Sequence, residues 1–323
     1  MSWISRPRVL VTCRIPTAAL DPLREIADVE VHERPAPLTP DELQTALRDK
    51  HGLVSVVTDR LDRAALEAAA SLRVVANIAV GYDNIDVAYA RHRGIVVTNT
   101  PDVLTESVAA FTWGLILAAT RRISEGERLV RRGEWRGWAL DFMLGMALPG
   151  KRLGIVGLGA IGQAVAAKAA AFGMDVAYAS RSHRPPAGEE QAAWRRVSLD
   201  ELLVSCDVVS LHVPLTRETT HLIDRKALVR MRRSAWLINT SRGPVVDEAA
   251  LVWALEEGVI SGAALDVFER EPVVSEGLLA LDNVLLAPHL GSATRETRTA
   301  MAELAAMNVV AVLQGRPAMT PVA

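Results

Sequence analysis

Cysteine is scarce in this sequence, which has only Cys13 and Cys206 among its 323 residues. Two cysteines that lie so far apart do not make a disulfide framework. Zinc sites and iron–sulfur clusters that use several thiolates are excluded for the same reason. We therefore expect a fold stabilised by burial of apolar side chains, and no metal site.

An excess of charge of either sign is also lacking. The chain has 36 basic and 38 acidic residues, which gives a net charge of −2. A dedicated binder of nucleic acid or of an anionic membrane carries a strong positive excess, and this composition has none. We expect neither nucleic acid nor a membrane as a partner.

Long apolar runs and a leader pattern are missing as well. The longest apolar stretches, such as 111–119, fall well short of the ~20 residues that span a bilayer. Residues 1–7 contain no apolar core of a secretory signal. These absences predict a cytoplasmic protein.

The sequence does contain enough apolar residues for large cores. Half of the residues are hydrophobic and 23% are charged, which excludes a mostly disordered chain. At ~150 residues per domain, the length predicts two domains. Short, nearly continuous β-branched runs, typical of parallel strands covered on both faces, recur at 9–12, 53–58, 74–79, 95–98, 153–156, 176–179, 208–213, 235–239, 263–266 and 284–287.

Helical segments separate these runs. Residues 40–48, for example, follow a capping Thr39 and begin with Pro40. Repeated alternation of strand and helix predicts an α/β fold with parallel sheets. Longer helices are expected at 104–121 and 292–314.

A Gly-rich stretch at 133–150 contains Trp135 and Trp138. Such a segment is either a packed surface loop or a contact element for another subunit or a ligand.

A G-x-G-x-x-G motif stands between a predicted strand at 153–156 and a helix at 163–172. In this context Gly157 permits a tight turn, Gly159 lets the backbone approach a pyrophosphate, and Gly162 lets helix and strand pack closely. The helix N-terminus then offers free N–H groups to the phosphates. The predicted dinucleotide-binding loop comprises Gly157, Leu158, Gly159, Ala160, Ile161 and Gly162.

The end of the next strand lacks an acidic residue. An NAD site usually has a carboxylate there, ~20 residues past the glycines, to hold the ribose 2′-hydroxyl. This sequence has Ser180, Arg181, Ser182 and Arg184 instead, and guanidinium groups suit a 2′-phosphate. The pattern predicts NADPH as cofactor, with NADH as a weaker alternative; the other interpretation is a solvated basic loop.

Arg242, Glu271 and His289 each follow a predicted strand of the second half. In open α/β sheets, ligands bind outside the carboxyl ends of the strands. Reduction of a 2-oxo acid needs a cation for the carboxylate and a proton donor for the carbonyl oxygen, and histidine is suited to the second task near neutral pH. A carboxylate beside the imidazole favours its charged form. These three residues are the predicted catalytic set.

The chain resembles the D-isomer-specific 2-hydroxyacid dehydrogenases, and within them the glyoxylate/hydroxypyruvate reductases. The resemblance covers nearly the whole chain. Its motifs are IAVGYDNID at 78–86, TPDVLTE at 100–106, the glycine loop, HVPLT at 212–216, the segments around Arg242 and Glu271, and PHLGSAT at 288–294.

The resemblance implies two Rossmann-like or flavodoxin-like lobes with the active site in the cleft between them. Residues 1–100 and 289–323 would form the substrate-binding lobe, and residues 101–288 the dinucleotide-binding domain. Arg242 would bind the substrate carboxylate and carbonyl oxygen, His289 would donate the proton, and Glu271 would support His289.

Further roles are implied by the same resemblance. The backbone amides of Val80 and Gly81 would hold the substrate carboxylate. Trp138 would reach into the active site of a partner subunit, in a homodimer formed through the dinucleotide-binding domains. Asp266 would bond the nicotinamide carboxamide, and the residues near the cofactor would also include Pro214, Thr240 and Gly291.

The activity implied is NADPH-dependent reduction of glyoxylate and hydroxypyruvate to glycolate and D-glycerate. A reductase of 2-ketogluconate or of another 2-oxo acid is the alternative within the family. A nucleotide-sensing scaffold of the corepressor kind is the alternative from another class, because such relatives retain the catalytic set. A substrate panel with both cofactors separates these possibilities.

Overall fold

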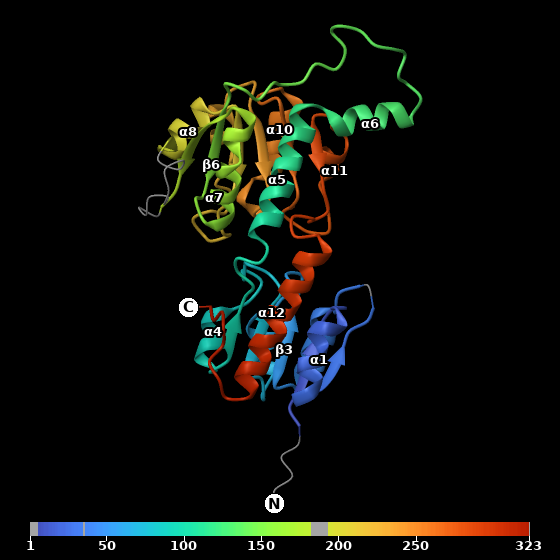
Figure 1. Ribbon diagram of the computed structural model, residues 1–323, viewed down its shortest axis with the longest axis vertical. Helices are drawn as coiled ribbons and strands as arrows, with labels where there is room; N and C mark the ends of the chain where they lie inside the picture. The colour runs from blue at the N-terminus through green and yellow to red at the C-terminus, as the bar shows by residue number, and fades with distance from the viewer. Residues whose placement is uncertain (1–5, 35, 182–192, 323) are drawn as a thin grey trace, which may run out of the picture. The chain divides into compact units, whose positions relative to one another are not determined.

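The computed structural model describes residues 6–34, 36–181 and 193–322. The chain divides into two compact units, which are Met1–Leu104 with Ala293–Ala323 (unit 1) and Thr105–Ser292 (unit 2). Each unit has a parallel β-sheet with helices on both faces (Figure 1). The predicted α/β class with parallel sheets is confirmed.

The sheet of unit 1 has the strand order β2-β1-β3-β4-β5, and every pairing is parallel. Helices α1 and α12 cover one face, and α2, α3 and α4 cover the other. The strands are β1 Arg8–Val11, β2 Asp28–Val31, β3 Gly52–Ser55, β4 Val74–Asn77 and β5 Val96–Thr98. The helices are α1 Thr17–Ile26, α2 Pro40–Leu47, α3 Arg63–Ala68, α4 Val87–His92 and α12 Arg295–Leu313.

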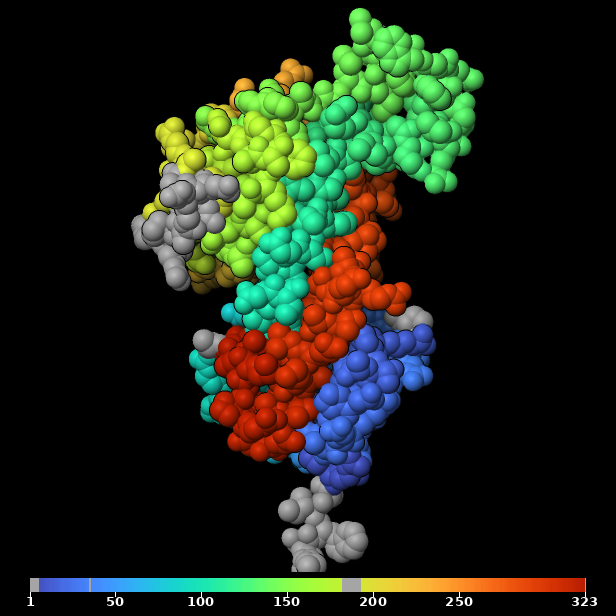
Figure 2. Space-filling view, viewed as in Figure 1, coloured from blue at the N-terminus to red at the C-terminus, as the bar shows by residue number. Residues whose placement is uncertain are grey.

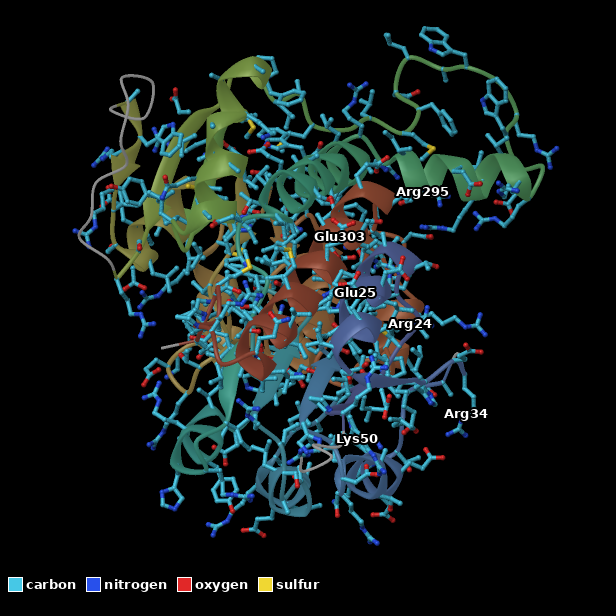
Figure 3. All side chains as sticks on the ribbon, turned by 60° about the horizontal axis from the view of Figure 1, so that its bottom comes forward. Arg24, Glu25, Arg34, Lys50, Arg295 and Glu303 are labelled. Carbon is cyan, nitrogen blue, oxygen red and sulfur yellow. The ribbon has the colours of Figure 1, made fainter. Side chains whose placement is uncertain are left out.

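Local sequence explains most of these elements. Helix α2 begins where predicted, because Thr39 accepts the Glu42 N–H and the Glu42 carboxylate accepts the Thr39 N–H. Strand β2 is absent from the prediction, since its Asp-Val-Glu-Val sequence is half exposed at the sheet edge and has no apolar run. At the same edge the buried Lys50 ammonium lies 3.0 Å from Glu30 Oε2 (Figure 3).

The sheet of unit 2 has the order β12-β11-β10-β9-β6-β7-β8, again parallel throughout. Helices α5 and α7 cover one face, and α8, α9 and α10 cover the other. The strands are β6 Arg152–Val156, β7 Asp175–Ala179, β8 Arg195–Arg196, β9 Val208–Leu211, β10 Trp236–Asn239, β11 Gly262–Leu265 and β12 Val284–Leu286. The helices are α5 Thr105–Thr120, α6 Ile123–Arg131, α7 Ala160–Ala167, η1 Ala169–Phe172, α8 Leu199–Ser205, α9 Arg225–Arg230, η3 Gly243–Val245, α10 Glu248–Glu256 and α11 Glu276–Leu279.

The strand order of unit 2 reverses at β6. Its neighbours β7 and β9 lie on opposite sides, so the chain leaves β6 in one direction along the sheet and later continues in the other. Such a switch point opens a crevice at the carboxyl ends of the strands, where open α/β sheets bind their ligands. The glycine motif follows β6 directly, so the fold places it at this crevice.

Helix α6 and the loop that follows it, residues 123–147, project from unit 2 (Figures 1 and 2); we call this segment the arm. Its apolar side chains face solvent, with Trp138 81% and Leu140 82% exposed. A packed surface loop would bury such side chains, so that interpretation is wrong. Among the described residues, no helix is both long and apolar enough to cross a membrane.

Candidate active site

The glycine loop has the backbone that its sequence demands. Gly157 has φ +96°, and a Cβ there would lie 2.6 Å from the His212 carbonyl oxygen. A Cβ at Gly162 would lie 2.1 Å from the Gly157 carbonyl oxygen. Both positions therefore accept only glycine without rearrangement.

The third glycine of the motif faces open space. No atom of the described residues lies within 4 Å of a Cβ built at Gly159, and this residue caps α7, which begins at Ala160. Leu158 and Ile161 pack partly against the core beneath α7. Open backbone at a helix N-terminus suits a pyrophosphate, so the loop fits the dinucleotide that the sequence predicted.

A cavity of about 970 Å³ adjoins this loop. Ser180 and Arg181 line it, as predicted for the 2′-phosphate position. The sequence analysis missed Arg196 on β8, which also lines the cavity and donates from Nη2 to the Ser180 carbonyl oxygen at 2.9 Å. Ser182 and Arg184 lie outside the described residues.

The two carboxylates that line this cavity, Glu201 and Glu218, both have partners. Glu201 is paired with Arg195 at 2.8 Å. The pKa of Glu218 is lowered, first by its hydrogen bond from Thr216 and also by the nearby Arg181 charge. Arg181, Arg196, Glu201 and Glu218 thus all line the cavity, and its two positive charges lie beside carboxylates that have partners.

His212 and Pro214 line the opposite side of the switch point, after β9. His212 Nε2 lies 2.8 Å from the Ser210 hydroxyl, and burial lowers the pKa of His212 to about 3. This imidazole is therefore neutral at physiological pH. Its Nδ1 is buried and has no hydrogen-bond partner in the described part of the chain.

His289 and Glu271 form a direct pair. His289 Nδ1 lies 2.9 Å from Glu271 Oε2, and both side chains are about one-third exposed or less. Burial acts to raise the pKa of Glu271, but the hydrogen bond and charge of His289, the Phe268 N–H and the Arg242 charge outweigh it and hold that pKa below its usual range. Glu271 is therefore ionised at neutral pH, and it bonds the imidazole through Nδ1.

The loop that carries His289 is held by Asp266. The Asp266 carboxylate accepts the N–H of Leu290 at 2.6 Å and of Gly291 at 2.8 Å, and its own carbonyl oxygen accepts the His289 N–H. His289 has φ +54°, a left-handed conformation that these bonds stabilise. Burial raises the pKa of Asp266. This carboxylate therefore orients the loop that carries His289, a role that the sequence analysis did not assign to it.

Arg242 lies close to that pair. Its Nη1 donates to the Ser241 carbonyl oxygen at 2.8 Å, and its charge acts on Glu271. The next residue, Gly243, packs directly on the following loop, since a Cβ there would lie 1.9 Å from the Phe268 carbonyl carbon. The fold of unit 2 thus brings all three predicted catalytic residues to one edge of its sheet.

Helix α5 supports the remaining predicted cofactor residues. Its Thr112 hydroxyl lies 3.0 Å from the Thr240 hydroxyl, and its Ser107 hydroxyl donates to the Gly291 carbonyl oxygen at 3.0 Å. Thr240 and Gly291 are therefore fixed close in sequence to the predicted catalytic residues Arg242 and His289. No group of histidine, cysteine and carboxylate side chains able to hold a metal occurs among residues 6–34, 36–181 and 193–322.

The other predicted substrate residues lie elsewhere in the chain. Val80 and Gly81 follow β4 at the carboxyl edge of the sheet of unit 1. Trp138 lies at the exposed arm of unit 2. The sequence analysis missed Asn77 and Asn99, which bond the backbone of the Val80–Gly81 loop. Polar residues at the ends of predicted strands were the signal that located Arg242, and the same signal marks both asparagines.

Known proteins resemble this chain over almost its full length. Residues 113–291 match the family model described as D-isomer specific 2-hydroxyacid dehydrogenase, NAD binding domain. The chain is 48% identical to the glyoxylate reductase of Thermofilum pendens over 97% of this chain and 93% of that protein. It is 50% identical to the glyoxylate reductase of Aeropyrum pernix over 97% of this chain and 95% of that one.

A solved structure supports the same relationship. The NADPH-dependent glyoxylate/hydroxypyruvate reductase of Sinorhizobium meliloti, in complex with NADP and malonate, superposes with a TM-score of 0.88 at 40% identity. The match covers 99% of this chain and 97% of that one. The chain therefore belongs to the D-isomer-specific 2-hydroxyacid dehydrogenase family, in its glyoxylate reductase subgroup.

Proposed function

We propose that the protein reduces small 2-oxo acids, glyoxylate and hydroxypyruvate above all, to glycolate and D-glycerate with NADPH. The observation that carries the proposal is the His289–Glu271 pair at 2.9 Å, with Arg242 beside it, on the sheet that holds the glycine loop. The glyoxylate reductases among the relatives support the choice of substrates.

In this proposal His289, Glu271 and Arg242 each have a separate role. The bound cofactor supplies the hydride. His289 donates a proton from Nε2 to the carbonyl oxygen of the substrate, and Glu271 stabilises the charged imidazole through Nδ1. Arg242 binds the carboxylate and stabilises the negative charge that develops on the oxygen.

The preference for NADPH rests on the cavity after β7. Ser180, Arg181 and Arg196 line it, and its Glu201 is paired with Arg195. A 2′-phosphate would receive charge-assisted hydrogen bonds from the guanidinium groups, whereas a 2′-hydroxyl would gain little from them. The S. meliloti relative with NADP bound supports this assignment.

The arm suits a second copy of the chain. Its exposed Trp138 and Leu140 form an apolar surface that water covers in a single subunit. We assign this surface to a homodimer in which Trp138 reaches the active site of the partner. Sedimentation of the wild type and of a Trp138→Ala variant tests this, and a monomeric wild type contradicts it.

One experiment tests the main proposal. The purified protein is assayed by loss of reduced-cofactor absorbance with glyoxylate, hydroxypyruvate, 2-ketogluconate and pyruvate, each with NADPH and with NADH. We expect the highest kcat/KM with NADPH and one of the first two acids. A higher kcat/KM with 2-ketogluconate would favour the alternative activity within the family, a reductase of that acid. A higher kcat/KM with NADH than with NADPH refutes the cofactor assignment. Binding of NADPH without turnover of any acid favours the scaffold.

A further inference from the structure

The loop after β4 in unit 1 is held by asparagine side chains through its carbonyl groups. Asn99 donates from Nδ2 to the Val80 carbonyl oxygen at 2.8 Å. One residue earlier, the Ala79 carbonyl oxygen accepts the Thr100 N–H, also at 2.8 Å. Two successive carbonyls of the loop thus face the end of β5.

The carbonyl of Gly81 is held from a different side. Asn77, which is fully buried, donates from Nδ2 to this oxygen at 3.0 Å. Asn77 is itself fixed, because its Oδ1 accepts the Ser55 hydroxyl at 3.2 Å and its Nδ2 also lies 3.2 Å from Asn84 Oδ1. The donor is therefore oriented by Ser55 of the neighbouring strand β3 and by Asn84 of the loop that follows β4.

These bonds fix the amide groups of the loop. A trans peptide is planar, and its N–H points opposite to its C=O. Bonds to the carbonyls of Ala79 and Val80 therefore orient the N–H groups of Val80 and Gly81 away from β5. Bonds to the carbonyls of Val80 and Gly81 immobilise the peptide planes on both sides of Gly81, a residue that would otherwise rotate freely.

The two amides remain available to a ligand. In the described ranges of the chain, neither the Val80 N–H nor the Gly81 N–H donates a hydrogen bond to another residue. Oriented, unused N–H groups are suited to bind an anion such as a carboxylate. The donors that orient them are neutral amides, which add no charge of their own.

The C-terminal segment holds Asn99 in turn. The Thr320 hydroxyl donates to the Asn99 carbonyl oxygen at 2.7 Å, and the Asn99 N–H donates to the Thr320 carbonyl oxygen at 3.3 Å. Asn308 of α12 anchors Thr320, with its Nδ2 2.9 Å from the Thr320 hydroxyl and its Oδ1 accepting the Thr320 N–H at 3.1 Å. Hydrogen bonds thus run continuously from α12 to the Val80 carbonyl.

We infer that Asn77 and Asn99 are positioning residues that orient the Val80 and Gly81 amides toward the carboxylate of a 2-oxo acid, and that Thr320 acts through Asn99. This inference rests on the proposed function. Because the Asn77 and Asn99 side chains are uncharged and bond this loop only through its backbone, they act on substrate binding and not on proton transfer.

The experiment compares Asn99→Ala, Asn77→Ala and Thr320→Val with the wild type, with Asn283→Ala of unit 2 as the matched control. We expect the KM for glyoxylate to rise about 10-fold or more in the asparagine variants, less in Thr320→Val, with kcat and the NADPH Kd near wild-type values. The Ki of oxamate, a carboxylate-bearing analogue, rises in parallel. The pH profile of kcat/KM keeps its shape.

The outcomes are distinguishable. If the wild type reduces no 2-oxo acid, the proposed function fails before the variants are measured. If the wild type is active and the folded Asn99→Ala variant keeps its KM and oxamate Ki, the positioning inference is wrong and the function stands. Circular dichroism and the unfolding midpoint establish folding. Where an alanine variant is unfolded, Asn99→Ser and Thr320→Val decide by the same criterion.

Discussion

The two sheets of this protein are both parallel, but different chemical groups lie at their carboxyl edges. In unit 2 the edge carries ionisable side chains, with Glu271 held ionised beside His289. In unit 1 the edge presents backbone amides, and the side chains that orient them are the neutral Asn77 and Asn99. We propose that the groups at the edge of unit 2 serve proton transfer and that those at the edge of unit 1 serve recognition of the substrate.

The contrast has a physical basis. A proton donor changes its charge during the reaction, so the groups around it must stabilise the protonated form that donates. A site that binds a carboxylate must keep its geometry. Its N–H donors are therefore held in place before the substrate binds, and they do not change charge near neutral pH. Variants at the unit 2 edge should therefore change kcat and its pH dependence, and variants at the unit 1 edge should change KM alone. Three predictions test the ionisable edge, and a fourth tests the cavity after β7 in the same unit.

The largest effect is expected for His289→Ala. Without the proton donor, kcat for glyoxylate should fall by about 10²- to 10⁴-fold, while NADPH binding, measured by fluorescence titration, stays the same. His92→Ala, on the exposed end of α4, is the control and should keep full activity. An unchanged kcat in His289→Ala would contradict the proposal that the edge of unit 2 supplies the proton donor.

Arg242→Ala should come next, with a loss of about 10²- to 10³-fold in kcat/KM for glyoxylate, because the charge on the developing alkoxide loses its partner. Arg242→Lys should recover only part of this loss, since lysine lacks the planar fork. Steady-state kinetics measures both. Arg270→Ala, an exposed arginine of the neighbouring loop, is the control, and an equal loss there would refute the specific role of Arg242.

Glu271→Gln should change the pH profile. The pKa of Glu271 lies below its usual 4.5, so the carboxylate charge is present at neutral pH and is lost only as the pH falls through that lowered value. Without this carboxylate the charged imidazole loses a stabilising partner, so the alkaline limb of kcat/KM for reduction should move to lower pH. Glu276→Gln of α11 should keep the wild-type profile. A shift of the same size in Asn99→Ala would contradict the proposed division between the edges.

Arg196→Ala should have the smallest effect. Loss of one charge-assisted hydrogen bond should raise the KM for NADPH by about 10-fold and leave that for NADH unchanged. Arg195→Ala removes the same charge from the same strand, but Arg196 and not Arg195 is among the described residues that line the cavity, so the loss of Arg195, which is paired with Glu201 at 2.8 Å, should matter little. An equal rise in the KM for NADPH in both variants would show that the overall positive charge, and not a specific contact of Arg196, governs NADPH binding.

The sequence predicted the fold where the signal was local. Continuous apolar runs located the buried strands, and the Thr39–Glu42 pair located the start of α2. Strands β2 and β8 were missed because they are exposed edge strands without such runs. The helix predicted after the glycine motif is divided, with α7 ending at Ala167 and a 3-10 turn following it.

By itself, the sequence determined the parallel α/β class and the glycine loop, and it marked Arg242, Glu271 and His289 as catalytic candidates, since each depends on residue type beside a strand. Only the tertiary structure decided which groups orient them. Asp266 bonds the loop of His289, and Asn99 bonds the carbonyl of Val80, from 19 residues further along the chain. Such partners are fixed by strand order and register, which bring distant residues together and which no local pattern encodes.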